Sequence, residues 1–248
     1  MKTVDKALTV LDQFSLERTE LGLSELSRLA ELDKAATRRL LVAMQKHGFI
    51  EQDAETRKYR LGHGFLRLAR IREATVPIVR AARDLCDWLV IRANETVHVS
   101  VPMAKGMTTI AHKLPPRGNV INIIPTQNLL YHATASGLAF TAFASQETQR
   151  QILALRRDMA TSATVTELGD LQALFELFRA QGYARTHNTF QNDVSSIAMP
   201  FFLGATDPAG TIALALPKED LTDARCAELI PLLKEAVGQM ELALTGMS

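Results

Sequence analysis

The first part of the chain has three short helical patterns in succession, and few folds begin in this way. Apolar residues recur at helical spacing over residues 3–15 and predict a first helix. Ser24 can cap a second helix that runs to about Glu31, and Asp33 can cap a third, since both side chains accept hydrogen bonds from helix-terminal N–H groups. Gly48 can end the third helix because glycine adopts the left-handed conformation common at that position.

A change of periodicity follows these helices. Residues 49–50 are apolar, residues 51–57 are polar, and residues 58–61 have a strand pattern, so this segment predicts a short hairpin with Tyr59 packed inward. Three helices followed by a hairpin are typical of the winged helix-turn-helix, whose recognition helix lies in the major groove of DNA. We therefore predict a winged helix-turn-helix over residues 1–62.

The predicted third helix has one face for packing and one face suited to DNA. The packing face must cover the first two helices, and the opposite face carries small and cationic residues. Such a narrow surface fits the major groove, which is read mainly by the N-terminal turns of a helix. The packing face is predicted to hold Ala36, Thr37, Leu40, Leu41 and Met44, and the outer face Lys34, Ala35, Arg38, Val42 and Gln45.

The chemistry of the outer face assigns a role to several side chains. Arg38 can make a bidentate contact to guanine, Ala35 can touch a thymine methyl group, and Lys34 can bind a phosphate. Arg39 lies at the border of the two faces, where an ion pair within the protein competes with a phosphate contact. Cations in the hairpin lie where a wing meets the DNA backbone or minor groove. The candidate DNA-contacting residues are Ser24, Lys34, Ala35, Thr37, Arg38, Arg39, Arg57 and Lys58.

The rest of the chain is long enough for a second domain, because 248 residues exceed the usual domain size of about 100 to 150. Residues 1–75 hold 14 Lys and Arg against 11 Asp and Glu, whereas residues 76–248 hold 14 against 16, a mild asymmetry that suits a DNA-binding head. Cys86 and Cys226 lie in apolar helical patterns, which speaks against a disulfide framework. Without a signal segment or an apolar stretch of about 20 residues, we expect a cytoplasmic protein that does not enter the membrane.

Helical and strand patterns alternate in this second part. Residues 63–76 predict a linker helix, with a break near Val76, and residues 77–248 predict a mixed α+β domain. Residues 95–124 have a strand pattern that turns at Lys105 and Gly106 and ends in the apolar run VINIIP. Further helices are expected over 134–144, 146–156, 167–181 and 222–245, and further strands over 194–204 and 211–216.

Several segments of the chain resemble the IclR family of bacterial transcription regulators in their order and spacing. They are SELSRLAELDKAATRRLLVAMQKHGFIEQD and KYRLGHGFLRLA in the head, then YHATASGLAFTAF, FRAQGYA, SSIAMPFF and TIALALP. This resemblance spans essentially the full chain and implies a repressor or activator that binds a partly palindromic double-stranded operator as a homodimer or a dimer of dimers. At the start of the recognition helix, Ala35 and Ala36 stand where the family commonly has a Ser-Thr pair, which removes two hydroxyl donors.

The resemblance also implies the fold and ligand of the second domain. The fold class is α+β: a winged helix-turn-helix and a C-terminal GAF-like or profilin-like domain, joined by the linker helix. That C-terminal domain binds a small metabolite effector, often an organic acid, and the resemblance implies no cofactor or metal. The effector site carried over from the family comprises Ile121, Leu129, Ala135, Ser136, Thr186, His187, Ser196, Ala213 and Ala215.

This sequence departs from the family's usual residues in the effector site. Family members commonly have an acidic residue at Thr186, Cys at Ser196 and Ser at both alanines of TIALALP. The absence of acids beside Arg185 and His187 predicts a neutral or basic lining, and we therefore expect an anionic effector with a larger apolar body, such as an aromatic carboxylate. Because alternate residues of a strand face opposite sides, either Thr186 or its two neighbours face the site.

Two other interpretations stay open from the residues alone. An enzyme would need a catalytic constellation, but Ser136 in TASG lacks the glycine of a nucleophile elbow, and no Gly-rich phosphate loop is present. The histidines lie on separate elements without metal-ligand spacing; they are His98, His112, His132 and His187. A winged helix can also bind a protein, and such binding would not weaken steeply with salt.

Overall fold

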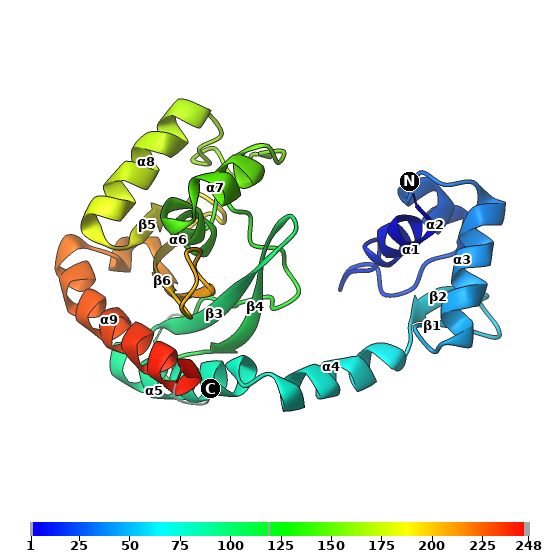
Figure 1. The fold of residues 1–248 in the computed structure, drawn as a ribbon, viewed down its shortest axis with the longest axis horizontal. Coiled ribbons are helices and arrows are strands. Elements are labelled where there is room, and N and C mark those ends of the chain that lie inside the picture. Colours follow the sequence, from blue (N-terminus) through cyan, green and yellow to red (C-terminus); the bar gives the residue numbers. More distant parts are fainter. Residues whose placement is uncertain (1, 119, 246–248) are drawn as a thin grey trace. The chain divides into compact units, whose positions relative to one another are not determined.

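The computed structural model describes residues 2–118 and 120–245 of the chain. It contains two compact units, one that ends at Val76 and one that begins at Pro77, and Figure 1 labels most of the elements of each. We call them the N-terminal unit and the C-terminal unit. Each has its own hydrophobic core, as separately folded domains do.

The N-terminal unit contains the three helices and the hairpin expected from the sequence, followed by a fourth helix. Its core brings together Val10, Leu26, Leu41, Ile50 and Tyr59, each at most 5% exposed, so Tyr59 points inward as predicted. The elements are α1 (Thr3–Leu11), α2 (Leu23–Leu29), α3 (Lys34–Lys46), β1 (Ile50–Gln52), β2 (Tyr59–Leu61) and α4 (Gly64–Thr75), and β1 pairs with β2 in antiparallel register.

The boundaries of the first two helices differ from the prediction. α1 ends at Leu11, one turn earlier than expected. Ser24 is not the N-cap of α2, because Gly22 occupies that position and the helix has already begun when the chain reaches the serine. The reason is long-range: Leu21 and Tyr59 exchange two backbone hydrogen bonds of 2.8 and 2.9 Å, which fix the chain directly before the helix.

The ends and the packing face of α3 agree with the prediction. Asp33 is its N-cap and accepts a hydrogen bond from the backbone N–H of Ala36 at 2.7 Å. Gly48 follows the end of the helix with a φ of 73°, the left-handed conformation expected of it. Of the predicted packing face, Ala36, Thr37 and Leu41 are buried and Leu40 and Met44 are half-buried.

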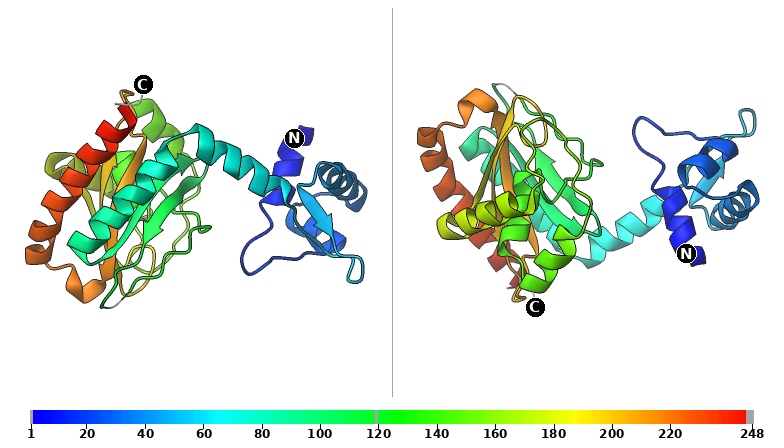
Figure 2. Two further views of the ribbon diagram at one scale, coloured as in Figure 1. Left: turned by 90° about the horizontal axis from the view of Figure 1, so that it is seen from below. Right: turned by 90° about the horizontal axis from the view of Figure 1, so that it is seen from above.

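A five-stranded antiparallel sheet forms the centre of the C-terminal unit, in the order β4-β3-β7-β6-β5. Figure 2 shows α5 and α9 on one face of the sheet and α6 and α8 on the other. The elements are α5 (Ile78–Ala93), β3 (Thr96–Met103), β4 (Gly106–Lys113), α6 (Ala135–Phe143), α7 (Gln146–Leu153), α8 (Leu168–Gln181), β5 (Ala184–His187), β6 (Val194–Phe201), β7 (Gly210–Pro217), the 3₁₀ turn η1 (Lys218–Asp220) and α9 (Asp223–Thr245).

Strand alternation divides the core of this unit into two layers. On β7, Ile212, Leu214 and Leu216 pack into the core under α5 and α9, where both cysteines also lie buried. Ala213 faces the opposite layer, with residues of α6 and α8. Of the residues of β7 expected in the effector site, Ala213 and Ala215 therefore both lie on the α6 face of the sheet.

One expected strand is absent from the part of the chain that the structure describes. Residues 120–124 of the run VINIIP form no strand but cross the α6 side of the sheet as a loop. Thr96 holds this loop, because its hydroxyl donates a hydrogen bond of 2.9 Å to the carbonyl of Ile121. The apolar side chains of this run therefore do not extend the sheet. They line a cavity on its α6 side, which is described below.

None of the described helices combines the length and hydrophobicity needed to cross a lipid bilayer. Likewise, residues 2–118 and 120–245 hold no group of three or more His, Cys, Asp or Glu side chains placed to bind a metal ion.

Candidate DNA interface and effector cavity

The outer face of α3 presents cations and small side chains to solvent. Lys34, Ala35 and Arg38 are exposed, and Val42 is 54% exposed. Among the described residues, neither Lys34 nor Arg38 has an ion pair or a side-chain hydrogen bond, so both can take an external anionic partner. Arg39, at the border of this face, lies close enough to Asp33 to lower the pKa of that carboxyl, although the hydrogen bond from Ala36 lowers it more.

A surface groove connects this helix face to the start of α2 and to the hairpin. Ser24, Arg38 and Arg57 all line it, which places three of the predicted DNA-contacting residues side by side. Thr37 does not belong to this surface. Its side chain is fully buried and its hydroxyl donates a hydrogen bond of 2.9 Å to the carbonyl of Asp33, so it cannot reach a DNA molecule and the prediction for this residue is wrong.

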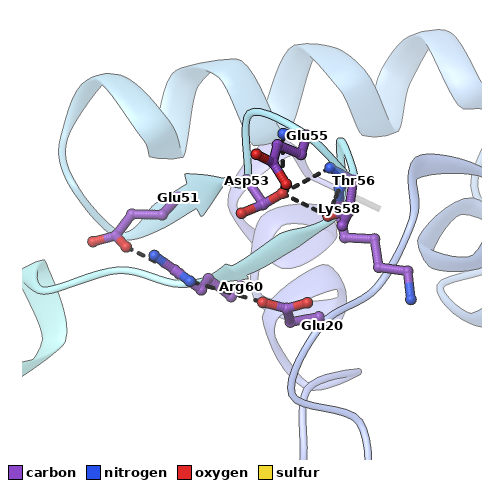
Figure 3. A network of polar contacts seen from close by, with 7 residues as sticks. All are labelled: Glu20, Glu51, Asp53, Glu55, Thr56, Lys58 and Arg60. Carbon is purple, nitrogen blue, oxygen red and sulfur yellow. Dashed lines mark hydrogen bonds and ion pairs between the residues drawn. The ribbon is translucent and has the colours of Figure 1, made fainter.

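The cations of the hairpin differ in whether they form ion pairs within the protein (Figure 3). Arg60 lies 3.2 Å from the carboxylate of Glu51 and 3.8 Å from that of Glu20. Figure 3 shows the long side chain of Lys58 extending away from these acids. Arg57 also has no ion pair within the described residues. The wing can therefore offer DNA the two cations predicted from the sequence, while Arg60 stabilises the hairpin.

Asp53 fixes the shape of the hairpin turn. Its carboxylate accepts hydrogen bonds from the backbone N–H groups of Thr56 and Glu55, at 2.7 and 3.1 Å, and from the hydroxyl of Thr56 at 2.9 Å (Figure 3). These bonds lower the pKa of the Asp53 carboxyl. Arg57 follows with a φ of 59°, and its carbonyl accepts a hydrogen bond from the side chain of Gln52. The wing residues are thus held in a defined loop.

A cavity lies on the α6 face of the sheet of the C-terminal unit. Its floor is a cross-strand row in which Thr186, Ser196 and Ala215 are register neighbours on β5, β6 and β7. The N-terminus of α6, at Ala135 and Ser136, closes one side, and loop residues 121–129 and 189–191 form the walls. The empty space of this hollow, including the part open to solvent, measures about 590 Å³.

Most of the residues predicted for the effector site meet in this cavity. The lining includes Ile121, Leu129, Ala135, Ser136, Thr186, Ser196 and Ala215. Ala213 lies one register row further along the sheet, where α6 and α8 cover it completely, so its predicted place in the lining is wrong. His187 is also misplaced: it points away from the cavity, and its Nδ1 lies 2.7 Å from the hydroxyl of Ser195 on the opposite sheet face.

Of the two alternatives predicted for the lining, neutral or basic, the described residues of the cavity fit the neutral one. Arg185 lies on the same face of β5 as His187, where it forms an ion pair of 2.6 Å with Asp223 and donates to the carbonyl of Leu221. Among the described residues that line the cavity, none is Asp, Glu, Lys or Arg. The lining is therefore neutral, and the argument for an anionic effector from basic side chains fails.

His98 is a lining residue that the sequence analysis did not assign to the site. It lies on the α6 face of β3, is 6% exposed, and its Nε2 lies 3.2 Å from the hydroxyl of Ser136. Its Nδ1 is buried and has no hydrogen-bond partner among the described residues. Burial, with a smaller contribution from His112, lowers the pKa of His98 to about 4, so the ring is neutral near pH 7.

Acidification is expected to destabilise the wild-type protein more than a His98→Gln variant. An unfolded histidine has a pKa near 6.5 and the folded His98 a pKa of about 4. Between these values the unfolded chain binds a proton that the folded chain does not, so stability falls as the pH falls through this window and is fully retained above it. The expected extra loss is about 1 kcal/mol per pH unit. Equilibrium urea unfolding of both proteins between about pH 7 and pH 4 measures it, and parallel curves would contradict it.

Both parts of the chain match families of known proteins. Residues 3–54 match the family described as IclR helix-turn-helix domain, and residues 74–242 match the family described as bacterial transcriptional regulator IclR C-terminal. The chain is 28% identical over 239 residues to the glycerol operon regulatory protein of Streptomyces coelicolor, a match that covers 96% of this chain and 92% of that protein.

Solved structures share the fold over the whole chain. A Silicibacter protein described as an IclR transcriptional regulator superposes with a TM-score of 0.91 at 33% sequence identity, covering 98% of this chain and 96% of that one. An IclR homologue of Microbacterium hydrocarbonoxydans, solved with 4-hydroxybenzoate, has a TM-score of 0.80 at 20% identity, covering 99% of this chain and all of that one.

Proposed function

The chain belongs to the IclR family of bacterial transcriptional regulators, and from this premise we propose that it binds an operator through its N-terminal unit under the control of a small organic acid bound in its C-terminal unit. The observation that carries the DNA-binding part is the outer face of α3. Lys34 and Arg38 are exposed there without side-chain partners among the described residues, next to Ala35 and beside two available wing cations. Cations in this arrangement supply the phosphate and base contacts of a major-groove helix.

The cavity on the α6 face supports control by a metabolite. It is a partly enclosed hollow in which apolar side chains such as Ile121, Leu129 and Phe190 lie beside uncharged polar ones, and such a mixture is typical of small-molecule sites. Because the homologue from Microbacterium hydrocarbonoxydans was solved with 4-hydroxybenzoate, an aromatic acid is a reasonable class to test first. The buried N-terminus of α6 would receive the carboxylate in place of a basic side chain.

We further propose a cytoplasmic homodimer or dimer of dimers, with α4 as the linker helix between the units. Val4 and Leu8 on α1 are 68% and 54% exposed, and Leu66, Leu68 and Ile71 on α4 are also exposed. A second copy of the chain would cover apolar surface of this kind. Two copies also match the two half-sites of a partly palindromic operator.

An enzymatic function is disfavoured by the environment of the one Ser-His pair in the cavity. His98 contacts the Ser136 hydroxyl, as a general base would, but no acid orients the ring, because its Nδ1 lacks a partner among the described residues. A histidine with a pKa of about 4 is also a weak base at neutral pH. We propose a binding role for this pair and no catalytic cofactor.

The salt dependence of DNA binding tests the proposed function. We expect the wild-type protein to bind the DNA that flanks its own gene, with an affinity that falls steeply as salt is raised, since cations displace counterions from phosphates. Replacing both Arg57 and Lys58 with alanine should reduce the slope of log affinity against log salt by about 2. Arg60→Ala is the matched control and should leave the slope nearly unchanged because Arg60 is committed to Glu51 and Glu20. Failure to bind this DNA, or binding that is insensitive to salt, would contradict the proposal.

A further inference from the structure

The closed end of the cavity holds backbone donors that have no acceptor within residues 2–118 and 120–245. The first N–H groups of a helix have no intrahelical partner. At the start of α6, the N–H of Gly137 donates a hydrogen bond of 3.0 Å to the hydroxyl oxygen of Thr134. The N–H groups of Ala135 and Ser136 remain without an acceptor among the described residues. Both residues line the cavity and are at most 3% exposed. Buried donors of this kind need a partner, and the cavity is where one can bind.

The contact with His98 determines whether the hydroxyl of Ser136 can also donate a hydrogen bond at this end of the cavity. An unpaired buried N–H is rarer in proteins than an unpaired buried acceptor, so the partnerless Nδ1 of His98 is assigned the lone pair and Nε2 the proton. Nε2–H then donates to the oxygen of Ser136. The hydroxyl hydrogen of Ser136 is therefore free to donate into the cavity, as a third donor beside the two N–H groups.

The neutral lining limits the charge that a ligand can bring into this site. The N-terminus of α6 and three donors can stabilise one carboxylate. A second carboxylate inside the cavity would lose its hydration without meeting a cation, because the described lining contains no Lys or Arg. The side chains on the floor, Thr186 and Ser196, are uncharged as well.

We propose that His98 is the positioning residue that directs the Ser136 hydroxyl toward the single carboxylate of the effector, beside the N–H groups of Ala135 and Ser136, and that the cavity admits no second negative charge. The inference rests on the proposed function to the extent that it takes this cavity as the effector site. It adds a recognition role for His98 and a charge limit that excludes dicarboxylates buried in the cavity.

Matched pairs of ligands test the charge limit by calorimetry on the full chain. Each pair compares a dicarboxylate with the monoamide of the same shape: succinate with succinamate, and phthalate with 2-carbamoylbenzoate, beside benzoate and 4-hydroxybenzoate. We expect binding of monocarboxylates, and within any pair that binds, the monoanion should bind about 100-fold more tightly or better. A dicarboxylate that binds as tightly as its monoamide, or a panel in which no monocarboxylate binds, would overturn the proposal.

A double-mutant cycle tests the role of His98 with the monocarboxylate that binds most tightly. His98→Phe and Ser136→Ala should each weaken binding by about 10-fold, and the double variant should be no weaker than either single one, because both remove the same donor. His98→Gln keeps an amide N–H near the position of Nε2 and should stay within about 3-fold of wild type. His112→Gln is the control, since His112 is the exposed register partner of His98 on β4 and does not line the cavity.

Additive losses, or wild-type affinity in His98→Phe, would overturn the positioning role. Thermal unfolding of each variant identifies loss of fold, and the Gln variant keeps the test decisive if the Phe variant is unstable. These measurements contain no DNA, so their failure is separate from failure of the proposed function, which the DNA-binding experiment decides.

Discussion

Replacing Arg38 with alanine is expected to weaken operator binding by about 1 to 3 kcal/mol, or about 5- to 150-fold, through the loss of one base contact. Arg38 is exposed on the outer face of α3 and lines the groove that also contains Ser24 and Arg57. A guanidinium at this place can make two parallel hydrogen bonds to the O6 and N7 atoms of guanine. The loss should therefore be confined to one base-pair position of each half-site, as measured with a series of operators that carry single substitutions.

Lys34→Ala is the matched comparison for Arg38→Ala. Lys34 lies on the same face, one turn closer to the N-terminus of α3, where an ammonium group meets phosphate and not a base edge. Its loss should weaken binding uniformly across the operator series. Arg38→Ala losses that are equally uniform would show that Arg38 binds the DNA backbone, and the assignment of a base contact would then be wrong.

The two alanines at the start of α3 cost the DNA-binding surface fewer hydroxyl donors than the sequence alone indicates. Ala35 is exposed, whereas Ala36 is 8% exposed and its N–H bonds to the Asp33 cap. A hydroxyl at the second position would therefore be buried and could not contact DNA. Of the two donors that are missing relative to the family's usual Ser-Thr pair, only the one at Ala35 affects the surface that faces the groove.

The fold of the N-terminal unit could be predicted from the sequence because its signals are local. The cap at Asp33, the glycine stop at Gly48 and the apolar spacing of α3 act within one or two helical turns. The start of α2 was predicted wrongly because it depends on the pairing of Leu21 with Tyr59, which is distant in the sequence.

The effector cavity shows where such prediction ends. Strand alternation indicates that Thr186 and His187 face opposite sides, but nothing local says which side is the cavity. The packing of α6 decides this, and it also covers Ala213 while leaving Ala215 in the lining. His98 could have been found only by knowing that β3 lies beside β7, a pairing between segments more than 100 residues apart.

Gly137→Ala is expected to destabilise the C-terminal unit by about 3 kcal/mol and to disturb the donor end of the cavity. A Cβ atom at Gly137 would lie 2.5 Å from the carbonyl oxygen of Leu130 and 2.5 Å from the Cα of Tyr131. These are backbone atoms, which cannot move aside as a flexible side chain can, so the start of α6 would have to shift. The shift would displace the N–H groups of Ala135 and Ser136, and urea unfolding together with monocarboxylate calorimetry would measure both effects.

Gly238→Ala separates this steric effect from the general effect of alanine in a helix. Gly238 lies within α9, and a Cβ atom there would meet no other atom within 4 Å. Alanine lowers the entropy of the unfolded chain and favours helix, so this variant should be more stable than wild type by about 0.5 to 1 kcal/mol. The same intrinsic gain acts at Gly137 and is outweighed there by the clash with the backbone of residues 130–131. Equal stability changes for the two variants would mean that α6 can retreat from these residues without loss, and the donor geometry of the cavity would then be less fixed than the close contact indicates.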